Sequence, residues 1–277
     1  MGVDGGDQVL VEELSFIYPG ADREALSGVN LLFERGRFYS ILGRNGSGKS
    51  TLARCLNALL APSAGRVTSC GHDTRDPYGS LEIKKSIAMV FQDPDTQMVG
   101  TSVEEEVAFG PENLGLPADV IRERVDRSLD LTGLPDLSGR QPLRLSEGQK
   151  QLVAIAGALA MEPAFLVSDE STSMLDTIAR QRILELFLSL KDKGMGIIHV
   201  THFLEEAAMA DRVIVLDNGR VRAEGAPSDI LYDPVSVRDM GLDPLPVTSV
   251  AREMSAIGHP PDRPVLTVEE LLSCIRA

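Results

Sequence analysis

The sequence is poor in cysteine and in positive charge. Its three cysteines, Cys55, Cys70 and Cys274, are odd in number, widely spaced and without a CxxC pair, which predicts free thiols in a reducing compartment. Lysine and arginine number 27 against 41 aspartates and glutamates, so the formal net charge is −14. A surface of that sign repels phosphate backbones and anionic membranes, which argues against nucleic acid as the main partner.

Long apolar runs and targeting signals are also missing. The longest apolar stretch, LVAIAGALAMEPAFLV, is interrupted by Glu162 and Pro163, so it is not expected to span a membrane. The N-terminal MGVDGGDQ is acidic and has neither the basic start nor the apolar core of a signal peptide. We therefore expect a soluble protein that is not exported and that reaches any membrane through a partner.

Alternating and helical patterns follow one another along the chain. Residues 8–20 alternate like an edge strand and end in a Pro-Gly turn, and residues 28–43 continue with a second alternating run and a buried strand. Helical patterns with acidic caps follow from about Ser102. Two short apolar runs, PAFLVSDES and GMGIIHVTH, then flank a helical segment, as in a parallel sheet. Asn218-Gly219 stands between two alternating runs, which predicts a β-hairpin.

These patterns predict an α/β fold with a parallel-sheet core and an antiparallel N-terminal β part. One domain is expected to span residues 1–226, with a helical subdomain at about 93–160. After Pro227 the composition loosens. Residues 227–277 are therefore expected to form a small C-terminal helical appendage that buries little surface alone.

The most informative motif is a glycine-rich loop between a predicted strand and a predicted helix. It matches G-x-x-x-x-G-K-[ST] and comprises Gly43, Arg44, Asn45, Gly46, Ser47, Gly48, Lys49, Ser50 and Thr51. The backbone N–H groups of such a loop cradle phosphates, Lys49 reaches the β and γ oxygens, and the Ser50 hydroxyl is a ligand for Mg²⁺. The glycines are needed because side chains would block this close approach. The loop predicts binding of a nucleoside triphosphate.

Two carboxylates follow a second apolar strand, in FLVSDES. Asp169 and Glu170 are expected at the carboxyl edge of the sheet, where α/β proteins bind their ligands. Such a pair alone more often belongs to a solvated loop, but beside a phosphate loop it indicates a catalytic and metal-binding role. Asp169 is expected to hold Mg²⁺, directly or through water, and Glu170 to polarise the attacking water or accept its proton.

The segment LSEGQKQL, residues 145–152, opens a predicted helix. Ser146 and Gln149 have the spacing of a capping box, and the free N–H groups and the dipole of a helix N-terminus favour a bound anion. Glu147 puts a negative charge at this position. At roughly 7 Å and an effective dielectric of about 20 it would repel each unit of phosphate charge by on the order of 2 kcal/mol.

In chain order these motifs resemble the ATP-binding subunit of an ABC transporter. The phosphate loop is followed by VFQDPD with Gln92, LSEGQKQ with Ser146, Gly148 and Gln149, SDESTSMLD with Asp169, Glu170 and Asp176, and VTHFLEEA with His202. FIYPG, VFQDPDTQMVGTSVEEEVAFGPENLGLP, MGLDPLPVTSVAREM and LTVEELL narrow the resemblance to the ATPase subunits of energy-coupling factor importers, including the cobalt-type ATPases. The similarity covers essentially the entire chain.

The resemblance implies a P-loop NTPase fold of the ABC type, with ATP and Mg²⁺ as cofactors. It implies ATP hydrolysis that energises import of a vitamin or a transition-metal ion. The implied partners are a second ATPase subunit, identical or paralogous, a membrane coupling subunit and a substrate-capturing membrane subunit. The implied location is the cytoplasmic face of a prokaryotic cell membrane, and nucleic acid is not an expected partner.

The resemblance also assigns roles to side chains. It makes Tyr18 the aromatic that stacks on adenine, and Asp176 a residue of the dimer seam. Gln92 senses Mg²⁺ and the γ-phosphate, and His202 contacts the γ-phosphate and orients the water. The implied catalytic residues are Glu170, His202, Lys49 and Gln92, the implied metal ligands are Ser50, Gln92 and Asp169, and Ser146, Gly148 and Gln149 bind the ATP held by the other subunit.

Three positions depart from the usual pattern of this family. Glu147 stands in place of glycine, Leu152 in place of arginine and Ser168 in place of an apolar residue. Leu152 shares an apolar helix face with Ile155 and Leu159, so packing is its expected role, and Ser168 is expected to hydrogen-bond a neighbouring strand or loop. The motif LSEGQKQ corresponds to the signature motif of the family, and we call the helix that it opens the signature helix. Glu147 predicts that the ATP site to which this motif contributes closes less tightly than the second ATP site of the dimer.

Other functions stay open at the level of sequence. An ABC-type ATPase of DNA repair or chromosome organisation needs a long coiled-coil insertion or a basic surface, and the chain has neither sustained heptads nor excess positive charge. An ATP-binding regulatory subunit with little hydrolysis usually has its base replaced, whereas Glu170 is present. An exporter or an amino-acid importer would be distinguished by its membrane partners.

Overall fold

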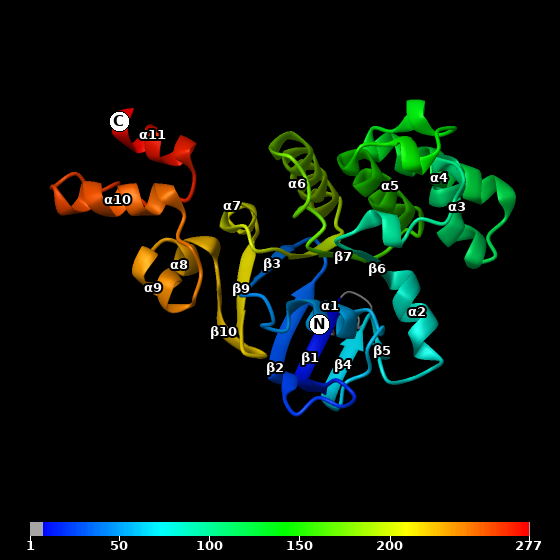
Figure 1. Cartoon of the computed structure of the whole chain (residues 1–277), viewed down its shortest axis with the longest axis horizontal. Coiled ribbons are helices and arrows are strands. Elements are labelled where there is room, and N and C mark those ends of the chain that lie inside the picture. The colour runs from blue at the N-terminus through cyan, green and yellow to red at the C-terminus, as the bar shows by residue number, and fades with distance from the viewer. Residues whose placement is uncertain (1–7, 277) are drawn as a thin grey trace, which may run out of the picture.

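The computed structural model describes residues 8–276, which form two β-sheets, a group of helices at one end and a helical tail at the other (Figure 1). The acidic N-terminal segment lies outside the described residues except for Gln8. The expectation that it is no signal peptide therefore stays a prediction.

The first sheet is antiparallel, with the strand order β2-β1-β4-β5. Its strands are β1 (Gln8–Ile17), β2 (Glu24–Glu34), β4 (Ala64–Ser69) and β5 (His72–Asp73). The prediction that β1 is an edge strand is wrong, because β1 pairs with β2 on one side and with β4 on the other. Alternation reports that one face of a strand is buried and carries no information on how many of its edges are paired.

The second sheet has the order β10-β9-β3-β8-β7-β6. Its strands are β3 (Phe38–Leu42), β6 (Ile87–Val90), β7 (Phe165–Asp169), β8 (Gly196–Val200), β9 (Arg212–Asp217) and β10 (Arg220–Gly225). All neighbours are parallel except β9 and β10. The predicted hairpin is confirmed, since β9 and β10 pair antiparallel around Asn218 and Gly219, whose φ angles of 48° and 76° suit a two-residue turn.

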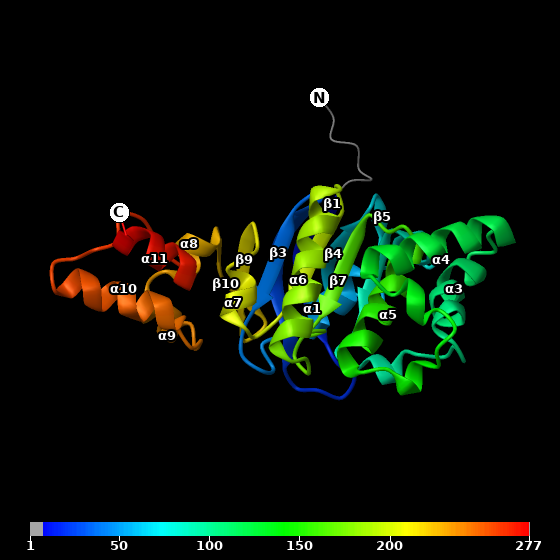
Figure 2. The same cartoon turned by 90° about the horizontal axis from the view of Figure 1, so that it is seen from above.

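Helix α1 (Lys49–Leu56) lies between the two sheets, and α6 (Thr177–Asp192) covers the other face of the six-stranded sheet (Figures 1 and 2). Leu52 and Leu56 of α1 are fully buried in one cluster with Phe33 of β2 and Val167 of β7. Both faces of β3, β7 and β8 are therefore covered, and every residue of these strands is buried. This packing puts the start of α1 at the carboxyl ends of β3 and β7.

A group of three helices stands beside β6 and β7. They are α3 (Val103–Asn113), α4 (Ala118–Thr132) and α5 (Glu147–Ala160), and α2 (Gly79–Ser86) precedes β6. The helical pattern predicted from Ser102 is confirmed, because the Ser102 hydroxyl caps α3 by accepting the Glu105 N–H. The limits drawn for a helical subdomain stay a prediction.

The chain ends in a helical segment at the opposite end of the six-stranded sheet (Figure 2). Its helices, together with the short helix after β8, are α7 (Leu204–Ala207), α8 (Pro227–Leu231), α9 (Pro234–Asp239), α10 (Pro246–Ala256) and α11 (Val268–Arg276). Leu231, Val237 and Ala251 share a core with Val213 and Val215 of β9. Within residues 8–276 no helix combines the length and apolarity needed to cross a bilayer.

Candidate functional site

The loop between β3 and α1 has the backbone that the glycine motif predicts. Gly43 and Gly48 have φ angles of 151° and 104°. A Cβ atom would lie 2.3 Å from the Leu216 carbonyl oxygen at Gly43, and 2.5 Å from the Ala25 carbonyl oxygen at Gly48. Only glycine fits both positions. The loop can therefore fold tightly over the N-terminus of α1, where backbone N–H groups and the helix dipole favour phosphate.

Lys49 is buried at the first position of α1, with only 5% of its surface exposed. Its Nζ donates to the carbonyl oxygens of Gly43 at 2.9 Å and Arg44 at 3.3 Å. Glu170 Oε1 lies 3.5 Å from the same nitrogen. These partners satisfy a charge that would otherwise be costly to bury. They hold the ammonium between the loop and the end of β7.

A pocket of about 490 Å³ opens above this lysine. It is lined by Tyr18, Ala25, Asn45, Gly46, Gly48, Lys49, Ser50, Thr51, Gln92 and Glu170. The Tyr18 hydroxyl lies 3.1 Å from Thr51 Oγ1, and the Tyr18 ring packs edge-on against Phe16. The structure thus brings Tyr18 and Gln92, which lie far apart in sequence, to the same pocket as the phosphate loop.

Asp169 ends β7 beside the first turn of α1. Ser50 Oγ donates to Asp169 Oδ1 at 2.8 Å. Burial raises the pKa of the Asp169 carboxyl, and the hydrogen bond from Ser50 opposes this shift only in part. The described residues contain no group of three or more His, Cys, Asp or Glu side chains placed to hold a metal. Two adjacent hard oxygen ligands nevertheless suit Mg²⁺, which commonly takes its other ligands from phosphate and water.

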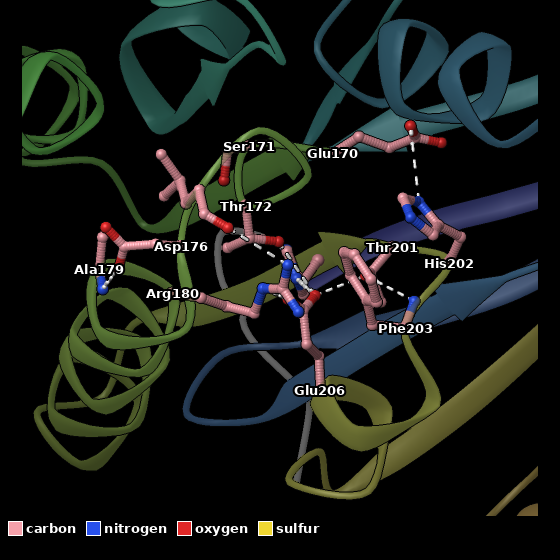
Figure 3. Close-up of polar contacts among 12 residues, drawn as sticks. Glu170, Ser171, Thr172, Asp176, Ala179, Arg180, Thr201, His202, Phe203 and Glu206 are labelled. Carbon is pink, nitrogen blue, oxygen red and sulfur yellow. Dashed lines mark hydrogen bonds and ion pairs between the residues drawn. The ribbon is translucent and has the colours of Figure 1, made fainter. Parts of the chain in front are cut away.

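Glu170 has a strained backbone. Its φ angle is 51°, and its N–H donates to the Val200 carbonyl oxygen at 3.0 Å. A non-glycine residue in this region costs about 1–3 kcal/mol and persists where the surroundings impose it. The carboxylate Oε2 lies 3.9 Å from His202 Nδ1 (Figure 3). Its Oε1 lies 3.5 Å from Lys49 Nζ, so the carboxylate stands between a cationic group and a polar one. This strained backbone conformation therefore places the Glu170 side chain between Lys49 and His202.

A second pocket, of about 700 Å³, adjoins the first. Asn45, Gln92 and Glu170 line both pockets. The remaining lining comes from Gly43, Arg44, residues 202–205 and parts of segment 241–246. A Cβ at Gly241 would lie 2.8 Å from Arg44 Cδ, so the tail packs closely on the phosphate loop. Sequence reasoning missed this wall of the site, because the tail holds no motif that marks it.

The start of α5 has the predicted capping box. Ser146 Oγ accepts the Gln149 N–H at 3.3 Å, and Gln149 Oε1 accepts the Ser146 N–H at 3.1 Å. Gly148 faces α6, where an added Cβ would lie 2.7 Å from the Ala179 Cβ. Of the described residues that line the two pockets, none comes from this helix start. Ser146, Gly148 and Gln149 are thus not part of the pocket that holds Lys49 and Glu170.

Glu147 has a partner that the sequence reasoning did not include. Lys150 Nζ lies 3.0 Å from Glu147 Oε1 and 2.8 Å from Asp95 Oδ2. Hydrogen bonds to Asp95 and then to Glu147 raise the pKa of Lys150. The ammonium therefore stays charged and offsets part of the acidic charge. The three-residue spacing of Glu147 and Lys150 on a helix was the available signal, whereas nothing local points to Asp95.

The two other departures have the roles predicted for them. Leu152 is 3% exposed and packs in the same core as Ile155 and Leu159. Ser168 Oγ is hydrogen-bonded to His199 Nδ1 on the neighbouring strand β8, at 3.0 Å, and to Ser171 Oγ. Both predictions are confirmed.

Sequence reasoning also missed a buried carboxylate next to the site. Glu206 of α7 is 1% exposed and hydrogen-bonds to Thr172 and Thr201, which stand close to Glu170 and His202 in the chain. Glu206 lies within VTHFLEEA. Glu205 and Glu206 are neighbours on the same short helix, and no local pattern shows which of them is buried, so only the fold reveals Glu206.

Comparison with known proteins assigns this architecture. The sequence pattern of the ABC transporter family matches residues 26–173. The chain belongs to the ABC transporter family. This ABC ATPase is similar to the energy-coupling factor transporter ATP-binding protein EcfA1 of Symbiobacterium thermophilum, with 49% identity over 254 residues, 91% of this chain and 88% of that protein. It is also 41% identical over 267 residues to the cobalt import ATP-binding protein CbiO of Syntrophus aciditrophicus, covering 96% and 95% of the two chains.

Solved structures agree with this assignment. The ABC ATPase resembles cbiO1 from Clostridium perfringens, described as part of the ABC transporter complex cbiONQ, with a TM-score of 0.77 and 37% identity over 90% of this chain and 99% of the other. It also resembles a dimeric ATP-binding cassette in a post-hydrolysis state with ADP and Pi, with a TM-score of 0.72 and 30% identity over 79% and 98% of the chains.

These findings confirm the predicted ABC-type P-loop fold and the energy-coupling factor branch. The ABC ATPase binds and hydrolyses ATP, and its hydrolysis energises transport. The relatives are transporter subunits, so a role in DNA repair or as a non-hydrolysing regulator is not favoured.

Proposed function

We propose that this ABC ATPase energises import of a vitamin or a transition-metal ion. It does so at the cytoplasmic face of a prokaryotic membrane, with a second ATPase subunit, a membrane coupling subunit and a substrate-capturing membrane subunit. The main observation behind the chemistry is that Lys49, the adjacent pair Asp169 and Glu170, and His202 come from three different segments and converge at one edge of the sheet. The similarity to energy-coupling factor and cobalt import ATPases supports the direction and the class of cargo.

The residues have distinct tasks in hydrolysis. Lys49 neutralises charge on the β and γ phosphate oxygens, and His202 contacts the γ-phosphate and orients the water. Glu170, between these two groups, accepts the water proton. The water oxygen bonds to the γ-phosphorus, the bond from that phosphorus to the bridging oxygen breaks, and ADP leaves with the electron pair.

Ser50 and Asp169 are the side chains that would hold Mg²⁺, because their oxygens already lie 2.8 Å apart at the start of α1. Gln92 lines both pockets and can reach the same region. The ion would supply charge neutralisation at the β and γ phosphates. The charged form of Asp169, which burial disfavours, would be stabilised by the cation.

The signature helix works on the ATP of the partner subunit in this proposal. Ser146, Gly148 and Gln149 do not reach the pocket of their own chain. A helix N-terminus with a satisfied cap and free N–H groups favours an anion. Head-to-tail pairing of two subunits brings each such helix to the phosphate loop of the other, which gives two composite ATP sites.

A groove beside Gln92 is suited to the membrane coupling subunit. It has a volume of about 320 Å³ and lies between β6 and the helices α3 and α5. Met89, Phe91, Phe109, Ala158 and Met161 contribute to its lining. Phe109 is 49% exposed, so an apolar segment of a partner would gain burial there. Phe91 lines the groove, and Gln92, the next residue in the chain, lines both pockets of the ATP site. A partner seated in the groove would therefore contact the segment that carries Gln92.

Tyr18→Ala is expected to raise the KM for ATP about 5- to 10-fold with little change in kcat. Adenine stacking is equal in the ground and transition states, so losing it affects binding and not the chemical step. Steady-state ATPase assays on the purified complex measure both constants. Tyr18→Phe is the matched control, because it keeps the ring and loses only the contact with Thr51. A large fall in kcat with unchanged KM would contradict the stacking role.

Glu147→Gly is expected to lower the KM for ATP by no more than about threefold at physiological salt. The bare repulsion of on the order of 2 kcal/mol is largely offset by Lys150 at 3.0 Å and by salt. Lys150→Met should have the larger and opposite effect, because it leaves Glu147 and Asp95 uncompensated. Titrating ATP at low and high salt tests the pair. An unchanged KM for both variants at low salt would show that neither charge faces the phosphate.

The assembly is tested by identifying the proteins that copurify with a tagged full-length chain from native membranes. We expect two kinds of integral membrane protein and either one or two kinds of ATPase chain in constant ratio. Mass spectrometry with cross-linking decides between these. Recovery of the chain without any membrane protein, under conditions that preserve ATPase activity, would contradict the proposed transporter.

A further inference from the structure

A buried carboxylate joins the two loops that carry Glu170 and His202. Glu206 Oε2 accepts hydrogen bonds from Thr172 Oγ1 at 3.0 Å and from Thr201 Oγ1 (Figure 3). It also accepts a hydrogen bond from His199 Nε2 at 2.7 Å. Burial by itself would raise the pKa of Glu206, but the hydrogen bonds from His199, Thr201 and Thr172 outweigh it and the pKa is lowered. Glu206 is therefore a charged, fixed anchor beneath the site.

Arg180 of α6 approaches the other oxygen of this anchor. Its Nε lies 3.4 Å from Glu206 Oε1. Among the described residues neither of these two buried atoms has a hydrogen-bond partner. The pair is thus close enough to attract and not aligned enough to bond. A shift of a few tenths of an ångström between α6 and α7 would complete or break the contact.

The same arginine is stacked with the ring next to His202. The Arg180 guanidinium carbon lies 3.8 Å from the centroid of the Phe203 ring. The Phe203 and His202 ring centroids are 4.1 Å apart, with a tilt of 38°. Such cation–π contacts are attractive when the cation lies over the face of the ring, as it does here. Arg180, Phe203 and His202 therefore form one continuous stack that ends 3.9 Å from Glu170.

At its other side Arg180 is tied to the loop that contains Asp176. The Arg180 N–H donates to the Asp176 carbonyl oxygen at 3.0 Å, and the guanidinium donates to the Leu175 carbonyl oxygen at 3.3 Å. Asp176 caps α6 through a 2.8 Å bond from the Ala179 N–H. Ala179 in turn contacts Gly148 of the signature helix. Arg180 thus touches the segment expected at the dimer seam and the segment that carries His202.

We propose that Arg180 and Phe203 are positioning residues that hold the His202 ring and transmit the position of the Asp176 loop to it, with Glu206 as the fixed anchor. They act through His202 and take no direct part in the transfer of the proton or the phosphoryl group. The proposal rests on the role of His202 at the γ-phosphate. In it, a partner that moves the Asp176 loop shifts Arg180 against Glu206 and reorients His202, so hydrolysis depends on how the two subunits are seated.

The test is steady-state ATPase activity of the purified, assembled complex carrying Arg180→Met, Phe203→Leu or Phe203→Tyr. Arg180→Met and Phe203→Leu are expected to lower kcat by ~10- to 100-fold, the scale of a misplaced catalytic group, with KM for ATP and Tm within about twofold and two degrees of wild type. Phe203→Tyr keeps the ring and should retain wild-type kcat. The double variant should be no slower than the slower single variant, because both act through one contact.

Two comparisons make the outcome decisive. Gln181→Ala, on the exposed face of the same helix, should leave kcat unchanged. Phe203→Leu leaves the Arg180–Glu206 pair intact. If Arg180→Met is unstable, the kcat of Phe203→Leu alone tests the proposal. If Phe203→Leu has the wild-type kcat while His202→Ala is inactive, the positioning proposal is wrong and the role of His202 stands. Full activity in His202→Ala would overturn the role of His202 and, with it, the positioning proposal. If the variants have a lowered Tm and an unchanged kcat, Arg180 and Phe203 only stabilise the fold and the positioning proposal is wrong.

Discussion

Lys49→Ala should abolish ATP-dependent transport and reduce ATP hydrolysis by at least about 10²- to 10³-fold, the usual loss for one preorganised electrostatic group. Lys49 is the buried cation of the phosphate loop, held by the carbonyl oxygens of Gly43 and Arg44 and placed 3.5 Å from Glu170. Alanine removes the charge that follows the β and γ oxygens into the transition state. Uptake into vesicles and phosphate release from the purified complex measure the two effects.

Lys193→Ala is the matched control for Lys49→Ala. It removes the same side chain at an exposed position after α6, so transport should be unchanged. Thermal unfolding of the Lys49→Ala complex should confirm that it is assembled. Transport at a substantial fraction of the wild-type rate in Lys49→Ala would show that this loop does not supply the catalytic site.

Glu170→Gln should bind ATP normally and hydrolyse it 10²- to 10⁴-fold more slowly, the range for loss of a general base. Glutamine has the same shape, so it can keep the strained backbone and the N–H bond to Val200. The substitution removes the negative charge that faces Lys49 at 3.5 Å, and with it the capacity to accept a proton. Because bound ATP is not hydrolysed, the closed two-subunit state should accumulate. Single-turnover assays measure the rate of hydrolysis, and size-exclusion chromatography with ATP measures the closed dimer.

The control for Glu170→Gln is Glu185→Gln, the same chemical change on the exposed side of α6. It should hydrolyse ATP at the wild-type rate. Hydrolysis at that rate by Glu170→Gln in the assembled complex would make the assignment of the base wrong.

Local chemistry made the phosphate loop and the capping box predictable. Both depend on residues within a few positions of one another, so their backbone needs can be read from spacing alone. Gly43 and Gly48 are required by φ angles and close carbonyl contacts that no other residue tolerates. The capping box of Ser146 and Gln149 is likewise local, and the structure confirms both of its hydrogen bonds.

Pairings between distant segments were less predictable. The alternation of β1 led to the prediction of an edge strand, which is wrong because both edges of β1 are paired. Glu147 looked like an isolated charge until Lys150 and Asp95 were seen beside it. Glu206 and Arg180 carry no motif, because their importance comes from the groups that β8, α6 and α7 bring around them.

The sequence by itself predicted the groups that we propose to act on phosphate, metal and water, because each lies in a short motif whose residue types and spacing are dictated by that chemistry. Tertiary structure alone decided how these groups meet. Parallel pairing of β3, β8 and β7 brings the loop, Glu170 and His202 to one edge, while the helical group carries Ser146 and Gly148 away from it. Those distances depend on packing between elements remote in the chain, for which no local pattern of residues exists.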